Sequence, residues 1–167
     1  FGCTAIHMAA QYGQLPILKY FIEERKGDVN VRNKPLETPA FYAAENKQHN
    51  VMKYLAEEAK ADLTLLDVNN NTVLYHTIRK NDLALMKYLL DEAKVKLDVN
   101  WRNRLGETLI YQAATQNRVE FLKYLVEQKC ADVNIPDTKS VTPLHSAAMR
   151  SHFQTCQYLV DHGADLN

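Results

Sequence analysis

The chain has 167 residues, which is long enough for one domain with a buried core. Hydrophobic residues make up 46% of the sequence and charged residues 24%, and this composition excludes a disordered chain. Lysine and arginine together number 20, as do aspartate and glutamate, so the neutral total provides no bulk attraction to nucleic acid or to an anionic membrane.

Cysteine use and the lack of long apolar runs indicate the compartment. The three cysteines, Cys3, Cys130 and Cys156, include no CxxC pair and cannot all be bridged to one another. We therefore expect free thiols in a reducing compartment, and hence an intracellular, cytoplasmic protein. No apolar run approaches the roughly 20 residues that a bilayer span needs, and no signal peptide opens the chain, so no membrane span is expected.

A threonine-led motif recurs five times along the chain. TAIHMAA begins at residue 4, and related segments begin at residues 38, 72, 108 and 142, at intervals of 34, 34, 36 and 34 residues. A Lys-Tyr pair and a DVN-like tail recur in step, except that Gln157 replaces the lysine in the last copy. This register predicts a single domain over residues 1–167 with five repeats, which begin near Phe1, Pro35, Asn69, Leu105 and Lys139.

Each repeat is predicted to open with a short helix. Its threonine is an N-cap candidate, and Pro39 and Pro143 follow directly at the first helical position, where a missing N–H costs nothing. The apolar residue two places after the threonine is expected to point inward. Alanine pairs such as Ala43-Ala44 allow neighbouring helices to approach closely.

A turn and a second helix complete the repeat. Glycine and asparagine suit a left-handed turn better than lysine and serine do, and the five turn residues are Gly13, Lys47, Asn81, Asn117 and Ser151. The second helix carries apolar residues at helical spacing, as in Val119, Leu122 and Leu125. The tail asparagines are expected to brace the next connection through hydrogen bonds from side chain to backbone. The two extra residues of the third repeat fall between Tyr88 and Asp98.

A repeat this short cannot bury its own apolar stripe, so the repeats must stack. The predicted fold is therefore all-α, built from stacked helix–turn–helix units joined by hairpin-like loops.

The motifs resemble those of the ankyrin-repeat family over essentially the whole chain. TPLHSAA at 142–148 matches the family's TPLHxA core in full, and HGADLN at 162–167 and LGETLIYQAA at 105–114 match its tail and its passage from hairpin to helix. The resemblance implies an ankyrin-repeat solenoid that binds another macromolecule and is not an enzyme.

Some positions depart from the family pattern. The glycine that usually lies two residues before the threonine is replaced by Leu36, Asn70 and Ser140. The third repeat has His76-Thr77-Ile78 where small residues are usual, so it is expected to be the least regular layer. Both ends look cut, which suggests part of a longer array or of a multidomain protein.

The sequence offers no pattern for catalysis, a metal or a cofactor. In the family, a histidine such as His7 or His145 resembles a structural residue that hydrogen-bonds the threonine of its own motif and a neighbouring backbone group. The other histidines have no Cys, Asp or Glu at ligand spacing, and no GxSxG, GxxxxGK[ST] or GxGxxG run occurs. We predict no catalytic residue, no metal site and no cofactor.

A tyrosine occurs in every second helix, where the family usually has leucine. We interpret these tyrosines as an aromatic ladder at the seam between helices, with hydroxyls that reach solvent; they are Tyr20, Tyr54, Tyr88, Tyr124 and Tyr158. Lysines adjoin four of them, but acidic residues four positions further on are expected to pair with these lysines. This neutral outer face disfavours binding of nucleic acid.

The resemblance also implies where a partner would bind: on the concave side, at the hairpin tips and the exposed side of each first helix. The candidate contact residues carried onto this chain are Tyr12, Lys34, Glu37, Glu45, Asn69, Asn71, Arg79, Lys80, Trp101, Arg104, Leu105, Glu107, Gln116, Lys139, Met149 and Arg150. Trp101 can also be interpreted as an apolar plug beneath the hairpin. These positions differ between repeats while the framework recurs, as a variable contact surface on a fixed scaffold would.

The leading hypothesis for function is a protein–protein interaction module whose partner is a protein or a peptide. An acidic or phosphorylated peptide is the favoured ligand, because Arg79, Lys80 and Arg104 are expected to face one stretch of the groove. Pairing of one of these cations with Glu107 is the competing interpretation. The alternative function is a structural solenoid segment of a larger channel, toxin or effector whose activity lies elsewhere.

Overall fold

The computed structural model describes residues 2–166, and nearly all regular structure in this range is helical. No β-strand occurs in this range, which confirms the all-α prediction. The chain divides into two compact units, Phe1–Lys96 and Leu97–Asn167, which are described separately below. The single domain over residues 1–167 stays a prediction. No helix within residues 2–166 has the length and apolar character to cross a membrane.

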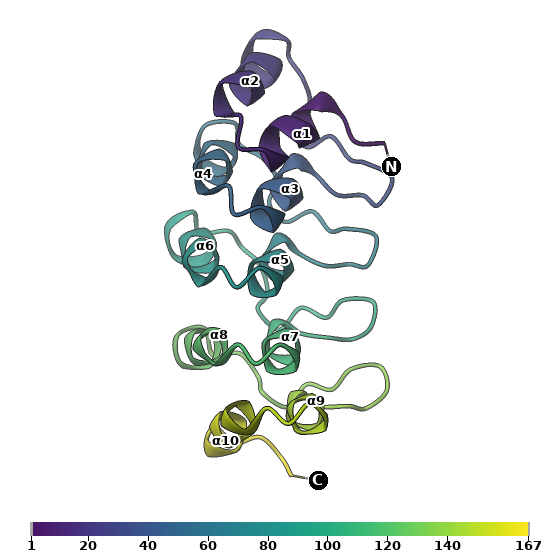
Figure 1. Cartoon of the computed structure of the whole chain (residues 1–167), viewed down its shortest axis with the longest axis vertical. Coiled ribbons are helices and arrows are strands. Elements are labelled where there is room, and N and C mark those ends of the chain that lie inside the picture. Colours follow the sequence, from purple (N-terminus) through teal and green to yellow (C-terminus); the bar gives the residue numbers. More distant parts are fainter. Residues whose placement is uncertain (1, 167) are drawn as a thin grey trace. The chain divides into compact units, whose positions relative to one another are not determined.

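The first unit contains three helix pairs. Its first helices are α1 (Ala5–Gln11), α3 (Pro39–Glu45) and α5 (Val73–Arg79), and each contacts the next. The second helices lie beside them (Figure 1): α2 (Leu15–Lys19) with η1 (Tyr20–Glu24), α4 (His49–Glu57), and α6 (Leu83–Lys87) with η2 (Tyr88–Glu92). The segments η1 and η2 are π-helical turns that continue the preceding α-helix, a feature that the sequence did not predict.

The second unit contains two helix pairs. The first helices α7 (Leu109–Thr115) and α9 (Pro143–Met149) contact each other. The second helices are α8 (Val119–Lys123), continued by the π-helical turn η3 (Tyr124–Gln128), and α10 (Phe153–Asp161). Within both units, helix–turn–helix layers stack as predicted.

The threonines start the first helices as expected. Each of the five occupies an N-cap in extended conformation, for example Thr38 with φ −99° and ψ 171°. In α7 and α9 the threonine hydroxyl accepts a hydrogen bond from the backbone N–H three residues on, which satisfies one of the free donors at the helix start. Pro39 and Pro143 lie at the first helical position, as predicted.

The turn after each first helix is left-handed in every repeat. Gly13 has φ 67°, Lys47 has φ 55° and Ser151 has φ 59°, so lysine and serine adopt the same conformation as glycine here. The predicted position of the turn is therefore confirmed even where the residue type is unfavourable.

The core of each unit lies between its two helix layers. Ala43 and Ala44 in the first unit and Ala113 and Ala114 in the second are fully buried, and their lack of bulk lets the stacked helices come close. Second-helix leucines such as Leu55 complete the core.

The connections between repeats are hairpin-like but do not form strands. In each, the N–H at the base donates to a carbonyl four residues on, as from Asn33 to Glu37 at 3.0 Å. The tail asparagines brace these connections: the Asn30 side chain accepts from the N–H of Asp62 at 2.8 Å, and Asn100 does the same for Asp132 at 2.9 Å. The bracing role predicted for these asparagines is confirmed.

The two extra residues of the third repeat lie after its second helix. Lys94 has φ 51° and matches Lys60, 34 residues earlier, with φ 55°, so the helix end keeps its register. The insertion therefore falls in the connection before Asp98. The boundary between the two compact units, after Lys96, lies in this same connection.

Candidate protein-interaction surface

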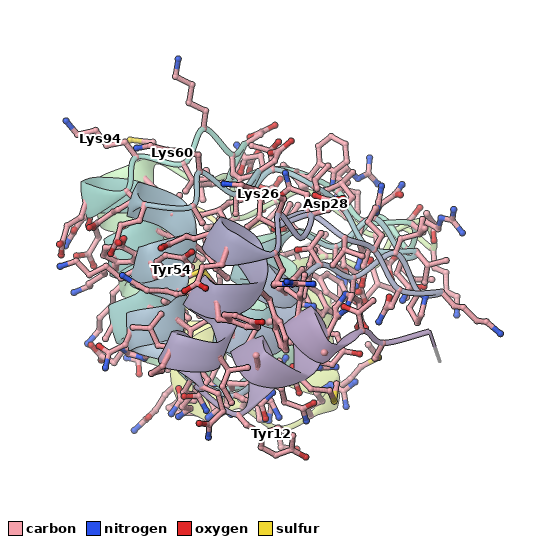
Figure 2. All side chains as sticks on the ribbon, turned by 90° about the horizontal axis from the view of Figure 1, so that it is seen from above. Tyr12, Lys26, Asp28, Tyr54, Lys60 and Lys94 are labelled. Atoms are coloured by element: carbon pink, nitrogen blue, oxygen red, sulfur yellow. The ribbon has the colours of Figure 1, made fainter. Side chains whose placement is uncertain are left out.

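We use the term recognition surface for the sixteen candidate contact residues that the sequence predicts. In the first unit they lie at the ends of first helices and in the connections. Tyr12 caps α1 and is 65% exposed, and it projects from the opposite edge to Lys26, Lys60 and Lys94 in Figure 2. Lys34 and Asn69 are exposed. Asn71 is only 7% exposed, and its side-chain amide donates to Asp67 at 2.9 Å.

Asn71 is therefore a correction to the predicted contact set. Its backbone N–H also donates to Asp67, so the residue fixes the shape of its own connection. A buried amide already engaged in this way is not available to a partner.

In the second unit the recognition surface contains the most exposed apolar side chains. Met149 ends α9 and is 72% exposed, and Leu105 in the connection before α7 is 59% exposed. Trp101 is 39% exposed, so it is not a buried plug beneath the hairpin. Arg104, Lys139 and Arg150 are exposed, whereas Glu107 and Gln116 are half-buried.

Glu45 organises a charge cluster within the first unit. Its carboxylate accepts from His76 Nδ1 at 3.0 Å and from Lys80 Nζ at 2.6 Å, and it also forms an ion pair with Arg79. Burial alone would raise the pKa of Glu45, but hydrogen bonds from His76, Arg79 and Lys80 outweigh it and hold the pKa at about 2. Arg79 and Lys80 are therefore paired, and their partner is Glu45.

Glu107, the predicted partner of this basic group, has polar neighbours of its own. Its carboxylate accepts from the amide of Asn103 at 3.0 Å and from Gln112 at 2.7 Å. It thus braces the connection before α7 within the second unit.

A small cavity lies next to the Glu45 cluster. It has a volume of 210 Å³ and is lined by Glu37, Tyr42, Glu45 and His76. His76 is 4% exposed, and its Nε2 has no hydrogen-bond partner. The sequence analysis missed Tyr42 and His76 as site residues, although His76 was singled out as an irregularity of the third repeat.

The motif histidines have the structural role that the resemblance implied. His7 Nδ1 lies 2.9 Å from the Thr4 hydroxyl and its Nε2 lies 3.0 Å from the carbonyl of Glu37. His145 contacts Thr142 in the same way, at 2.8 Å. Residues 2–166 contain no group of three or more His, Cys, Asp or Glu side chains placed to hold a metal ion.

The second-helix tyrosines form a ladder, but their hydroxyls do not simply reach solvent. Each of three donates to a glutamate 31 residues earlier, in the preceding repeat: Tyr54 to Glu23 at 3.0 Å, Tyr88 to Glu57 at 2.9 Å and Tyr158 to Glu127 at 3.1 Å. The predicted pairing of lysine with glutamate four residues on is also wrong for Lys19 and Lys123. Lys19 binds Glu58 at 2.8 Å and Lys123 binds Glu120 at 2.9 Å.

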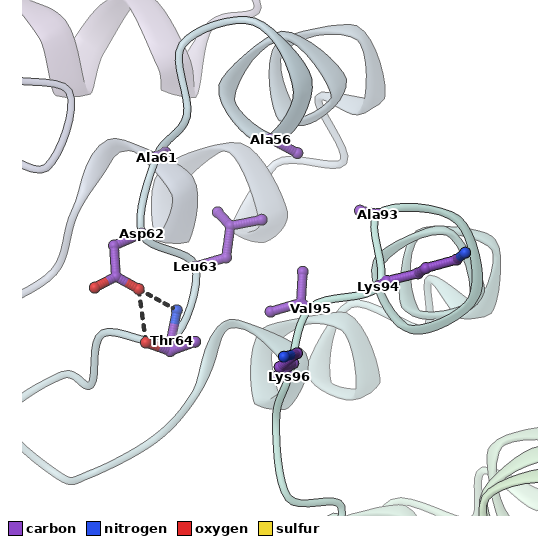
Figure 3. A pocket seen from close by; sticks show the side chains of 9 residues that line it. All are labelled: Ala56, Ala61, Asp62, Leu63, Thr64, Ala93, Lys94, Val95 and Lys96. Carbon is purple, nitrogen blue, oxygen red and sulfur yellow. Dashed lines mark hydrogen bonds between the residues drawn. The ribbon is translucent and has the colours of Figure 1, made fainter.

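A second, larger hollow lies at the ends of the second helices of the first unit (Figure 3). Its volume is 390 Å³, and its lining residues are Ala56, Ala61, Asp62, Leu63, Thr64, Ala93, Lys94, Val95 and Lys96. The Asp62 carboxylate accepts from the backbone and the hydroxyl of Thr64, so it is already engaged. Small aliphatic side chains and the stems of exposed lysines leave this hollow with little polar chemistry.

Stacked helix pairs with threonine caps, left-handed turns and variable exposed tips define a helical-repeat interaction protein. Residues 6–100 and 95–167 match the family model described as ankyrin repeats (3 copies). The chain belongs to the ankyrin-repeat family. Ankyrin repeats generally mediate protein–protein interaction, and domains made of them are typically non-catalytic.

The similar proteins are larger and diverse. The chain is 39% identical to alpha-latrocrustotoxin-Lt1a of Latrodectus tredecimguttatus over 62 residues, which are 37% of this chain and 4% of the toxin. It is 36% identical to palmitoyltransferase akr1 of Schizosaccharomyces pombe over 58 residues, 35% of this chain and 9% of that enzyme. It is also 37% identical to human ankyrin repeat domain-containing protein 49 over 59 residues, 35% of this chain and 25% of that protein. The match thus spans a quarter or less of each relative.

Proposed function

We propose that this chain is an interaction module that binds a protein or peptide partner through the recognition surface. The observation that carries the proposal is the exposure of large apolar side chains at these variable positions. Tyr12, Leu105 and Met149 are 65%, 59% and 72% exposed, whereas the repeated framework residues are buried. Exposed aromatic and Met side chains are typical of interface hot spots, because a partner that covers them removes apolar area from water.

The charge of the partner is a finer point of the proposal. An acidic or phosphorylated segment would find exposed cations at Lys34, Arg104 and Arg150, which form no ion pair within the described part of the chain. Arg79 and Lys80 are less suited to this role, since a partner carboxylate would have to compete with Glu45. We therefore place the acidic-ligand hypothesis on the exposed tip residues.

The test compares two variants of the full 167-residue chain. The first carries Tyr12→Ser, Leu105→Ser and Met149→Ser on the recognition surface. The second is a matched control with Ile17→Ser and Phe153→Ser, which are 47% and 78% exposed on the second helices α2 and α10. Proteins captured from a lysate by the unmodified chain are quantified by mass spectrometry, and affinities for captured proteins are then measured with purified components.

We expect the first variant to weaken binding at least tenfold, because each side chain contributes about 1 kcal/mol or more at an interface. The control variant should retain the affinity. Loss of binding in the control alone, or equal binding by both variants, would show that the partner uses a different face.

The alternative, a structural segment of a larger protein, is compatible with relatives of which the match is a small part, but those relatives do not favour it over an interaction module. A cytoplasmic location remains a prediction from the free cysteines.

A further inference from the structure

The cavity beside the Glu45 cluster has an unusual balance of hydrogen-bonding groups. The Glu37 carboxylate accepts one bond, from the Asn33 amide at 2.8 Å, and has no cationic partner among the described residues. Glu45 is ionised, as its lowered pKa shows, so both of its oxygens are acceptors. Two of the four lining residues are therefore carboxylates, and one of them lacks a counter-ion.

His76 adds a third acceptor. Because an ionised carboxylate can only accept, the contact of His76 Nδ1 with Glu45 requires the proton to be on Nδ1. In the neutral ring Nε2 then carries a lone pair, and this atom is buried without a partner. A buried acceptor left unsatisfied is unfavourable, so a ligand that brings an N–H to it gains a hydrogen bond at no loss to the protein.

Tyr42 supplies an aromatic wall. Its hydroxyl accepts from the Asn33 amide at 3.0 Å and lies 2.9 Å from Cys3 Sγ, so its polar end is engaged outside the cavity lining. Burial, the contact with Cys3 and the charge of Glu37 raise the pKa of Tyr42, so the ring stays neutral. A neutral aromatic ring beside two carboxylates is suited to a planar cation.

We propose that this cavity receives an arginine side chain of the protein partner, an inference that rests on the proposed function. A guanidinium offers five N–H donors in one plane and no acceptor, which complements a lining rich in acceptors. The volume of 210 Å³ equals roughly seven waters at about 30 Å³ each, enough for a guanidinium group and the end of its stem. An acidic side chain is excluded from this cavity by Glu37.

The cavity belongs to the variable positions and not to the framework. The residues at the position of Tyr42 and His76 in the other repeats are Met8, Gln112 and Ser146. At the position of Glu37 the other repeats have Cys3, Asn71, Glu107 and Val141. Two carboxylates and an unsatisfied histidine therefore meet at one place in the first unit, as a selected contact site would require.

The test uses the isotope-labelled 167-residue chain and NMR titration with N-acetyl-L-arginine methylamide. Its control ligand is the citrulline analogue, which has a similar shape but no charge and fewer donors. We expect saturable shifts of the His76 ring and the Glu37 carboxyl with the arginine compound, and at least tenfold weaker binding of the citrulline compound. The variant Glu37→Gln should weaken arginine binding about tenfold, since a charge-assisted bond is lost.

The matched control is Glu107→Gln, at the equivalent position of the fourth repeat and bound to Asn103 in the same way. It should bind arginine like the parent. Glu37→Gln keeps an oxygen that accepts from Asn33, and an unchanged melting temperature would show that it folds. Equal binding of arginine and citrulline compounds, absence of shifts at His76, or full binding by Glu37→Gln would overturn the proposal.

A second measurement separates this inference from the proposed function. Each partner identified by capture is tested as the native chain and with its surface arginines replaced singly by glutamine. If a partner binds through Tyr12 or Met149 and no arginine matters, the cavity proposal fails and the proposed function stands. If the arginine amide occupies the cavity but no captured protein depends on the recognition surface, the proposed function fails and the cavity stands as a guanidinium site.

Discussion

Glu45 receives a histidine, an arginine and a lysine from the next helix and its cap. The pair of Glu45 and Arg79 occupies the same position in successive repeats, 34 residues apart. Residues at equivalent positions of stacked helices lie next to each other, so the sequence contained the signal for this pair. The predicted partner, Glu107, was chosen from a loop position, whose side chain is directed by local hydrogen bonds that a repeat pattern does not specify.

The depressed pKa of Glu45 makes stability depend on pH. The folded pKa is about 2, below the ordinary value of 4.5, so the stabilising contribution is complete above pH 4.5 and is lost as the pH falls through 2. We expect Glu45→Gln to lower the free energy of unfolding at pH 7 by on the order of 2 kcal/mol, after allowance for partial exposure. Urea unfolding at pH 7, 5 and 3.5 should show this difference shrinking only below pH 4.5.

The control for this measurement is Glu120→Gln, which removes the exposed pair with Lys123. An exposed pair of this kind contributes little, so the control should unfold like the parent at every pH. A Glu45→Gln variant as stable as the parent at pH 7 would contradict the role of the cluster.

At the scale of the helices, the tyrosine ladder links each second helix to the one before it. Its place at the helix seam followed from spacing alone, because a residue that recurs every 34 positions falls on the same side of every second helix. The glutamate partners did not follow, since they depend on how far one helix is displaced along its neighbour. The π-helical turns that begin at Tyr20, Tyr88 and Tyr124 were also not predictable from apolar periodicity.

Tyr54 provides a test of the ladder. We expect Tyr54→Phe to lower the free energy of unfolding by about 1 kcal/mol, because the buried hydroxyl loses its bond to Glu23. Burial and then Glu23 raise the pKa of Tyr54 to about 12. This contribution is complete below pH 10 and is lost as the pH rises through 12, so the deficit of the variant should narrow in alkaline solution.

Tyr20→Phe is the matched control, because Tyr20 belongs to the first repeat and is 44% exposed. It should change stability by less than about 0.5 kcal/mol in urea unfolding. Equal losses in the two variants would mean that the inter-repeat hydrogen bond is not the source of the effect.

At the scale of the whole molecule, the repeat register predicted the fold class and nearly all helix starts. It did not predict the division into two compact units, because the insertion after Lys94 shows only as two residues of extra length. Length counts residues but does not say how much surface a connection leaves uncovered. Periodicity therefore describes each layer better than it describes the grouping of layers.

The two units should differ in their ability to fold alone. Residues 1–96 contain three helix pairs and residues 97–167 contain two. Since arrays need roughly three repeats for stability, the first fragment should be helical with a cooperative urea transition, and the second should be largely unfolded. Far-UV circular dichroism of both fragments tests this. A second fragment as stable as the first would show that two repeats suffice here.

Eleven non-glycine residues among those described have positive φ, including Leu36 with φ 64° and Lys47 with φ 55°. A side chain in this region costs roughly 1–2 kcal/mol that glycine would not. The array therefore carries a reserve of conformational strain that is divided among many turns, and each share can be relieved or increased by one codon. Because stability in a repeat protein is a sum of local terms, natural drift can adjust the rigidity of one layer while the others keep theirs.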